Sequence, residues 1–377
     1  MAEVTDQSVE PTIQTAPLAY RPKATTPEFI ASFDENIYRV IAHLMTLEKK
    51  TGHRVKLAVE PEPFCFLETI PETVEWFKEK IYTLKAAEKI AKYSGQPLSE
   101  VFGATRRYLG IVLDICHQSV AFEDIAADIE LLSQAGIPIF KLQEAAALRV
   151  DNVTVEIVEE LKKYTGTIYL SQTTELRNGV ITRFLNLEDA IAAWDKDPGP
   201  REWRTHFHVP VFLQDLGPFQ TTRSGIDDAL RVHARTPLST HLEIETYTWD
   251  VLPEHLKTGD ITEYVVRELE KLHPVFLHVV EGHTGGPRDN APFDYDALRK
   301  LYSGVWMVNN GYSNAMAQEA VTSGHADLVS FGRPALCNPD LVRRLKENAP
   351  LNEPFADTGF YGGSGPHGYT DYPFLPA

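Results

Sequence analysis

The chain has 377 residues, of which 43% are hydrophobic and 24% are charged, and its formal net charge is −17. This length and composition suffice for one large α/β barrel or for two modest domains. The negative charge argues against nucleic acid or an anionic membrane surface as a partner, because the chain offers neither of them a positive surface.

The first residues and the cysteines bear on the compartment. Residues 1–10 are polar and are expected to form a flexible arm without the basic and apolar regions of a secretory signal. No run approaches the roughly 18 apolar residues that cross a bilayer. The three cysteines, at positions 65, 116 and 337, lie far apart, which is typical of a reducing interior. We therefore expect a cytoplasmic protein without membrane insertion.

Short β-branched runs alternate with longer amphipathic stretches along the chain. The expected strands are 12–20, 55–62, 108–116, 137–143, 206–213, 240–247, 275–281, 305–310 and 327–332, with an accessory hairpin of 167–172 and 181–184. The expected helices are 28–50, 71–93, 122–135, 152–163, 260–272 and 315–323. Strands that alternate with helices indicate parallel β/α units. Nine such strands predict an α/β fold of the TIM (β/α)8 type with one extra strand.

The stretch KLAVEPEP, residues 56–63, ends an apolar strand on two glutamates. Glu60 and Glu62 share one face by strand parity, and in a barrel that face lies at the C-terminal mouth, where barrel enzymes place their sites. Burying a carboxylate is costly unless a cation or a hydrogen-bond donor meets it. A bound metal is the proposed partner of Glu60.

Polar side chains end several other expected strands. They are Asp114 with His117 just beyond it, Lys141, Gln143, His206, His208, His241, Glu243 and Glu245. Carboxylates, imidazoles and an amide at one mouth suit a divalent cation such as Mg, Mn, Co or Zn. Each residue also has a purely structural interpretation, in which a glutamate pairs with an arginine, Lys141 joins an ion pair and His206 is a satisfied core residue. The sequence leaves Glu243 and Glu245 as alternatives, because they share a face.

Long phrases in the first two thirds of the chain carry a resemblance, among them LAVEPEPFCFLET, YLGIVLDICHQ, HFHVPVFLQDLG and THLEIETYTWD. Residues 10–270 resemble the Ebo-operon metabolite-traffic protein of the EboE type, a xylose-isomerase-like TIM barrel. The metal ligands that this resemblance implies are Glu60, Asp114, Gln143 or His208, and Glu245 or Glu243. It also implies that His117 contacts the substrate. Ser171 departs from the pattern, since a histidine is expected there.

The last third contains the phrases GVWMVNNGYS, HADLVSFGRPALCNPDLVRRLKENAPLNEP and GFYGGSGPHGYTDYPFL. Gly311 and Gly332 end successive expected strands, where backbone N–H groups can approach an anion, and Arg333 can add a forked, charged donor. Residues 273–377 resemble the C-terminal part of the Old Yellow Enzyme family, the FMN-dependent ene-reductases. The resemblance implies that these residues and Asn310 grip the FMN phosphate and that Tyr361 lies near the flavin or substrate. Without the resemblance, Gly311 and Gly332 would be ordinary turn glycines and Arg333 a surface charge.

The two resemblances divide the chain into a flexible arm (1–10), a xylose-isomerase-like portion (11–272) and a flavin-reductase-like portion (273–377). We expect the last two to complete one hybrid barrel, so that the chain is a chimera. In the Old Yellow Enzyme family, the residues that hold the flavin ring and donate the proton lie on strands upstream of this portion. In this chain, xylose-isomerase-like sequence occupies the place of those strands.

The main hypothesis is a divalent-metal-dependent isomerase or epimerase that acts on a small sugar-like or polyol-like metabolite, or a degenerate relative of one. Its expected catalytic residues are Glu62, which moves a proton, His117 and Lys141. One alternative is an FMN-binding NAD(P)H oxidoreductase of the Old Yellow Enzyme type. Another is a non-catalytic hybrid barrel scaffold. The expected partner is a small metabolite and not nucleic acid, and a homo-oligomer is left open.

Overall fold

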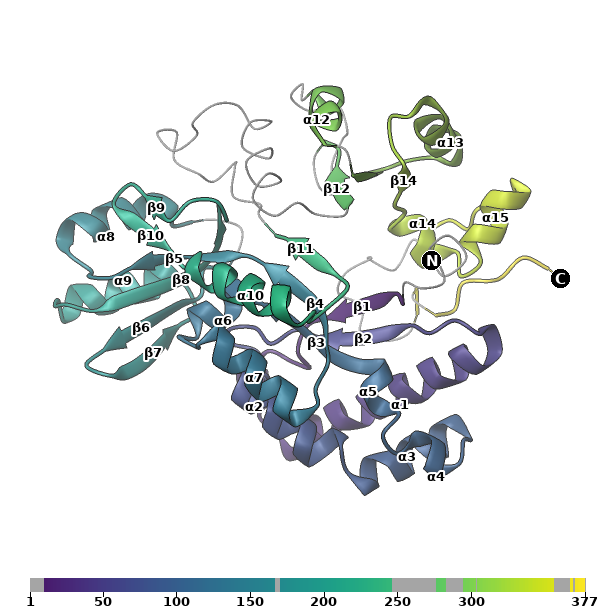
Figure 1. Cartoon of the computed structure of the whole chain (residues 1–377), viewed down its shortest axis with the longest axis horizontal. Coiled ribbons are helices and arrows are strands. Elements are labelled where there is room, and N and C mark those ends of the chain that lie inside the picture. Colours follow the sequence, from purple (N-terminus) through teal and green to yellow (C-terminus); the bar gives the residue numbers. More distant parts are fainter. Residues whose placement is uncertain are drawn as a thin grey trace. The chain divides into compact units, whose positions relative to one another are not determined.

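The computed structural model describes residues 10–166, 170–245, 276–282, 294–302, 304–355, 367–368 and 370–376. The chain divides into two compact units, Met1–Ile261 and Thr262–Ala377, and Figure 1 shows the elements of each. The predicted helix 260–272 and the predicted boundary at 272/273 lie outside the described residues.

Five parallel strands form the first sheet of the N-terminal unit, in the order β1-β2-β3-β4-β11. Their bounds are β1 Thr12–Thr15, β2 Lys56–Val59, β3 Leu109–Asp114, β4 Ile139–Glu144 and β11 Leu242–Ile244. Every residue of β2 and β3 is buried, as is usual for strands of a parallel sheet covered on both faces. Each of the five overlaps a predicted strand, so the predicted parallel β/α pattern holds here.

Helices alternate with the strands of this unit. They are α1 Pro27–Thr51, α2 Ile70–Trp76, α3 Leu84–Ser94, α4 Leu98–Val101, α5 Thr105–Tyr108, α6 Ile115–Val120, α7 Ile125–Ala135, α8 Val155–Leu161, α9 Leu187–Lys196 and α10 Ser224–Arg235, with short 3-10 helices at Arg21–Lys23 and Lys162–Tyr164. Figure 1 shows α1, α2, α3 and α7 gathered on one side of β1 to β4. Helix α1 begins where the Thr26 side chain accepts a hydrogen bond from the Phe29 amide, and it ends at Gly52, whose φ of 75° is left-handed.

The predicted helix 71–93 is interrupted. After α2 the chain forms a π-helical turn, Phe77–Ile81, and α3 begins only after Thr83, whose side chain accepts from the Ala86 amide. A threonine that caps the backbone in this way favours a new helix start over continuation of the old helix.

A second sheet of six antiparallel strands has the order β7-β6-β8-β5-β10-β9. The strands are β5 Ala146–Val150, β6 Thr173–Arg177, β7 Val180–Phe184, β8 Glu202–Val209, β9 Asp215–Leu216 and β10 Phe219–Thr221. The predicted strand 206–213 overlaps β8 as far as Val209, but its predicted place in a parallel barrel was wrong, because β8 pairs antiparallel with β5 and β6. The predicted hairpin is shifted to β6 and β7, since Asn178 and Gly179 supply the two positive φ angles, 53° and 79°, of its turn.

The C-terminal unit contains a three-stranded parallel sheet, β12-β13-β14. Its elements are β12 Phe276–Val280, α12 Tyr295–Leu301, β13 Val305–Asn309, α13 Asn314–Ser323, β14 Leu328–Val329, α14 Arg333–Cys337 and α15 Leu341–Glu347. Trp306 and Val308 of β13 are fully buried. They pack with Leu298 of α12 and Ala320 of α13 in one hydrophobic core.

The structure therefore confirms the α/β class with parallel strands, whereas closure of all strands into one hybrid barrel stays a prediction. Across the parts of the chain that the structure describes, no helix combines the length and the apolar character that a membrane crossing requires.

Candidate functional site

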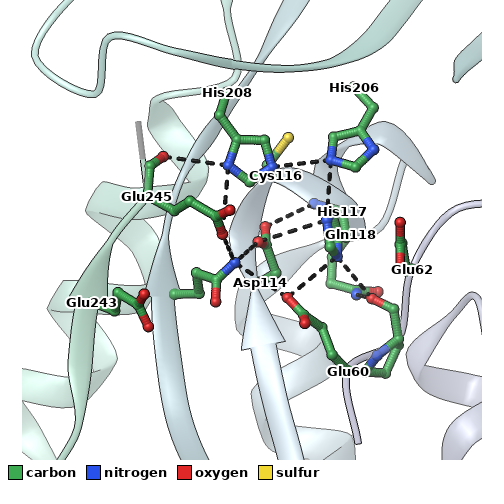
Figure 2. A network of polar contacts seen from close by, with 12 residues as sticks. Glu60, Glu62, Asp114, Cys116, His117, Gln118, His206, His208, Glu243 and Glu245 are labelled. Carbon is green, nitrogen blue, oxygen red and sulfur yellow. Dashed lines mark hydrogen bonds and ion pairs between the residues drawn. The ribbon is translucent and has the colours of Figure 1, made fainter. Parts of the chain in front are cut away.

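Four polar side chains meet at the C-terminal ends of neighbouring parallel strands (Figure 2). Glu60 follows β2, Asp114 ends β3, Gln143 lies near the end of β4, and Glu245 follows β11. These strands are consecutive in the sheet, so their ends lie along one edge. One carboxylate oxygen from each of Glu60, Asp114 and Glu245 lies within 4.8 Å of the others. We call Glu60, Asp114 and Glu245, together with the amide of Gln143, the carboxylate cluster.

The amide of Gln143 holds the carboxylate cluster together. Its Nε2 atom donates to Asp114 Oδ2 at 2.6 Å, to Glu60 Oε1 at 3.2 Å and to the Glu245 carboxylate. Its Oε1 atom is buried and has no hydrogen-bond partner among the residues described. One NH2 group thus faces three carboxylates, which is more acceptors than it has hydrogens.

Burial and mutual repulsion control protonation in the cluster. Burial, together with the charges of Asp114 and Glu245, raises the pKa of Glu60 to about 7. A cation placed among these carboxylates would act in the opposite direction, because opposite charge favours the ionised form.

Three buried histidines lie beside the carboxylate cluster. His117 belongs to α6, which begins directly after β3, and its amide donates to Asp114 Oδ1 at 3.0 Å. His206 and His208 come from β8 of the antiparallel sheet. The His206 Nε2 atom is 3.1 Å from His117 Nε2 and 3.0 Å from His208 Nε2. The sequence interpretation of His206 as an ordinary core residue missed this convergence.

The charges around these imidazoles act differently on two of them. Burial lowers the pKa of His117, but the carboxylates of Asp114 and Glu60 outweigh burial and raise it overall. Burial, and then the neighbouring imidazoles, place the pKa of His206 well below its usual value.

The other predicted site residues of this unit lie around the cluster. The Glu62 carboxylate accepts a hydrogen bond from the Cys65 thiol, with the sulfur 3.7 Å away. Lys141 contacts the carboxylate of Glu243 and the amide oxygen of Gln14, and burial lowers the pKa of Lys141. Of the two alternatives that the sequence left open, Glu245 joins the carboxylate cluster and Glu243 pairs with Lys141.

Gln14 and Ser171 are two residues that the sequence analysis did not assign to the site. Gln14, on β1, donates to the Glu60 carboxylate, and sequence reasoning missed it although it occupies the next strand of the same sheet. Ser171, which stands where a histidine was expected, is buried, and its hydroxyl accepts from the Leu187 amide. It therefore serves the start of α9.

In the C-terminal unit, the ends of β13 and β14 carry the predicted phosphate-binding residues. Asn310 and Gly311 follow β13 with φ angles of 97° and 68°, and the Asn310 side chain donates to the Glu281 carbonyl at 2.6 Å. Gly332 follows β14, and a Cβ atom added to it would meet nothing within 4 Å. Arg333 is the first residue of α14 and is exposed. Tyr361 lies outside the residues described.

Donors and an acceptor are available at these strand ends. Within the described part of the chain, the amide N–H groups of Gly311 and Gly332 donate to no backbone or side-chain acceptor. The Oδ1 atom of Asn309, the last residue of β13, is buried without a partner in the same part of the chain. Sequence reasoning did not single out Asn309.

Comparison with known proteins identifies relatives of the C-terminal part. Residues 257–352 match the NADH:flavin oxidoreductase / NADH oxidase family. A 12-oxophytodienoate reductase-like protein of Solanum lycopersicum is 40% identical over 115 residues, which are 30% of this chain and 31% of that protein. The 12-oxophytodienoate reductase 7 of Oryza sativa subsp. japonica is 51% identical over 78 residues, which are 21% of this chain and 20% of that protein. The chain thus spans less than a third of the length of these curated relatives.

Solved structures of two further proteins align with most of the chain. Morphinone reductase aligns over 96% of this chain and 92% of its own, with 17% identity and a TM-score of 0.41. The Old Yellow Enzyme homologue of Zymomonas mobilis aligns over 96% of this chain and 95% of its own, with 18% identity and a TM-score of 0.40.

The family match and the curated relatives support the flavin oxidoreductase alternative better than the isomerase hypothesis. The resemblance of residues 10–270 to the EboE type stays a prediction, as does a divalent metal. The similarity of the C-terminal part to flavin oxidoreductases is confirmed over residues 257–352.

Proposed function

We propose that this chain is an FMN-dependent NAD(P)H oxidoreductase, whose C-terminal unit binds the FMN phosphate. The observation that carries the proposal is the match of residues 257–352 to the NADH:flavin oxidoreductase / NADH oxidase family. The names of the curated relatives point to 12-oxophytodienoate as the first substrate to try.

The chemistry of the C-terminal strand ends fits a phosphate. Backbone N–H groups without a side chain in the way bind phosphate oxygens closely, and Gly311 and Gly332 offer two such groups. The guanidinium of Arg333 supplies charge and a planar fork of donors. Bound FMN supplies a group that accepts hydride from NAD(P)H and passes it on. The residues named here anchor its phosphate and orient it.

Binding of FMN and of riboflavin to the full chain tests the phosphate site. We expect FMN to bind more tightly than riboflavin, which lacks the phosphate. Arg333→Ala should weaken FMN binding about tenfold or more, as expected for a lost charge-assisted contact, and leave riboflavin binding unchanged. The matched control is Arg343→Ala, which removes an exposed arginine that pairs with Glu347 on α15. Equal affinity for FMN and riboflavin would overturn the proposed phosphate site.

Activity is tested separately on the FMN-loaded chain. We expect oxidation of NADPH that depends on 12-oxophytodienoate. FMN binding without such oxidation would leave the phosphate site standing and contradict the oxidoreductase assignment.

A second candidate function rests on the carboxylate cluster of the N-terminal unit. We propose that the cluster binds a divalent cation in a metal-dependent isomerase-like site. The supporting observation is that the Gln143 amide nitrogen lies among three carboxylates, which is where a cation would neutralise them better. When Gln143 turns its amide, its Oε1 atom becomes a ligand of the kind that hard cations prefer.

The cation would polarise a carbonyl or hydroxyl of a sugar-like substrate. Glu62 and Lys141 are the proposed proton-transfer residues and His117 the proposed substrate contact. Metal content tests this candidate: the double variant Glu60→Gln, Asp114→Asn should lose Mn²⁺, whereas Glu243→Gln should retain it. Unchanged Mn²⁺ content in the double variant would contradict the assignment.

We also propose that portions 11–272 and 273–377 complete one hybrid barrel. The five parallel strands of one sheet and the three of another match the eight that a (β/α)8 barrel requires. Limited proteolysis within residues 283–293 is the test, and two folded fragments that separate freely would contradict a single barrel.

A further inference from the structure

We propose that His117, His206 and His208 form a second divalent-cation site, of Zn²⁺ or Co²⁺ type, beside the carboxylate cluster. The inference rests on three imidazole nitrogens that the carboxylate cluster does not use, so it stands whether or not that cluster binds its own cation. It makes His206 a metal ligand and not the core residue expected from sequence, and for His117 it replaces the substrate-contacting role proposed above.

The three imidazoles are fixed in the same tautomer. The Nδ1 atom of each lies next to a carbonyl oxygen: Pro61 O at 3.0 Å from His117, Gln172 Oε1 at 3.0 Å from His206, and Glu245 O at 3.3 Å from His208. A carbonyl oxygen accepts hydrogen bonds, so each Nδ1 carries the hydrogen. In the neutral ring, Nε2 then bears the lone pair. An Nδ1–H group held by a carbonyl is the usual support of a histidine that binds metal through Nε2.

The Nε2 atom of His206 lies between the rings of His117 and His208 (Figure 2), and one ligand atom each of His117, His208 and Asp114 lies within 4.8 Å of the others. The separations are 3.1 Å for His117 to His206 and 3.0 Å for His206 to His208. Nitrogen ligands about 2.05 Å from a tetrahedral zinc ion lie about 3.3 Å from one another. The observed spacings need only a small expansion to reach this geometry. All three rings are at least nine-tenths buried, with exposed fractions of 4%, 9% and 1%.

Hydrogen bonds between the imidazoles do not readily explain the short contacts of the three Nε2 atoms. The single Nε2 atom of His206 takes part in both short contacts. A hydrogen on it can point to only one neighbour, so both contacts are filled only if His117 and His208 are imidazolium ions that share the one lone pair of His206. Two like charges this close in a buried site repel strongly. One divalent cation can accept all three lone pairs at once, and imidazole suits zinc and its neighbours.

Asp114 is the proposed fourth ligand. Its Oδ2 atom is 3.7 Å from His117 Nε2, and it shares one group of close ligand atoms with His117 and His208 and another with Glu60 and Glu245. Asp114 could therefore bridge two cations, one at the histidines and one at the carboxylate cluster.

Cobalt is the probe, because Co²⁺ bound by nitrogen ligands absorbs visible light. The full chain is stripped with a chelator, dialysed against Co²⁺, and examined by metal analysis and visible absorption. We expect a visible band that His206→Gln abolishes and Glu60→Gln retains. The control is His43→Gln, which changes an exposed histidine of α1. Loss of the band in Glu60→Gln with retention in His206→Gln, or no cobalt uptake at all, would overturn the inference.

A second variant covers the event that His206→Gln fails to fold. Gln172→Leu leaves every imidazole in place and removes only the acceptor of His206 Nδ1. We expect it to weaken cobalt affinity about 10- to 100-fold, which is the usual effect of losing such a supporting contact. Unchanged affinity in this variant would contradict the tautomer argument. FMN binding, measured on the same preparations, reports on the C-terminal unit, so failure of the flavin proposal is distinguishable.

Discussion

The two units offer candidate sites of opposite construction. In the N-terminal unit, buried side chains at the ends of β2, β3, β4 and β11 create the site, and Asp114 has no exposed surface. In the C-terminal unit, backbone N–H groups at Gly311 and Gly332 carry the proposed site, with an exposed arginine beside them. A side-chain site stores repulsion that a ligand relieves, whereas a backbone site costs the fold little when its ligand is absent.

This difference determines what reveals each site. A cluster of unbalanced buried carboxylates stands out in the structure, because folding has to overcome its desolvation. Two glycines and an arginine after strands do not stand out in a structure, and they gain weight from the match of the surrounding sequence to a known family. The contrast also predicts that substitutions at the first site alter stability strongly, and substitutions at the second alter it weakly.

The largest effect is expected at Gly110 on β3, the strand that positions Asp114. A Cβ atom there would lie 2.5 Å from the carbonyl oxygen of Pro138 and 2.8 Å from the Phe140 ring. Gly110→Val should therefore push β3 from β4 and cost about 3 kcal/mol or more. Thermal unfolding measures the loss. An unchanged melting temperature would show that β3 and β4 are less tightly packed than the structure indicates.

A smaller effect is expected from a cation. Mn²⁺ at a hundred times its Kd should stabilise the N-terminal unit by about 2.7 kcal/mol, because it binds the folded state only. The Glu60→Gln, Asp114→Asn double variant should lose this stabilisation. Glu243→Gln is the control that should keep it, since Glu243 pairs with Lys141 outside the cluster. Mn²⁺ prefers oxygen ligands, so it distinguishes the carboxylate cluster from the three histidines.

Periodicity predicted the parallel strands well and the antiparallel sheet poorly. Buried strands such as β2 and β3 are continuous apolar runs that short-range patterns detect. The strand β8 mixes polar and apolar residues and is only partly buried. Its partners β5 and β6 are antiparallel, and a run of residues does not record the direction of its neighbour. The Asn178–Gly179 turn was a local signal for the hairpin that strand propensity alone misplaced.

The sequence predicted the carboxylate cluster better than the histidine site. The position of Glu60, Asp114 and Gln143 at expected strand ends predicted that they meet, because the carboxyl ends of neighbouring parallel strands lie along one edge of the sheet. His206 was missed because its role depends on the His117 ring, from α6, and on the side-chain carbonyl of Gln172 that fixes its tautomer. Such contacts link residues far apart in sequence, and spacing within one strand cannot show them.

The pH dependence of stability distinguishes the units further. Glu144, on β4, is buried, neither of its carboxylate oxygens has a hydrogen-bond partner among the described residues, and burial raises its pKa to about 8. A raised carboxyl pKa gives stability that is complete below the unfolded value of about 4.5 and is lost as the pH rises through the folded value.

Without metal, the N-terminal unit should therefore become less stable between pH 5 and pH 8. Glu144→Gln should remove on the order of 2 kcal/mol of this change. Denaturant unfolding at pH 5, 6.5 and 8 measures the slope. A variant with the same slope as the natural chain would assign the pH dependence to other carboxyls, such as Glu60.

The smallest effect on stability is expected at the backbone site. Gly332 has a φ of −86° and open space around its α-carbon, so Gly332→Ala should change stability by less than about 0.5 kcal/mol. Gly311 has a φ of 68°, and Gly311→Ala should cost about 1 kcal/mol because an alanine is strained there. Both should weaken FMN binding relative to riboflavin. Normal FMN affinity in Gly332→Ala would mean that no phosphate approaches this backbone. The C-terminal unit would then offer no backbone site to contrast with the side-chain site of the N-terminal unit.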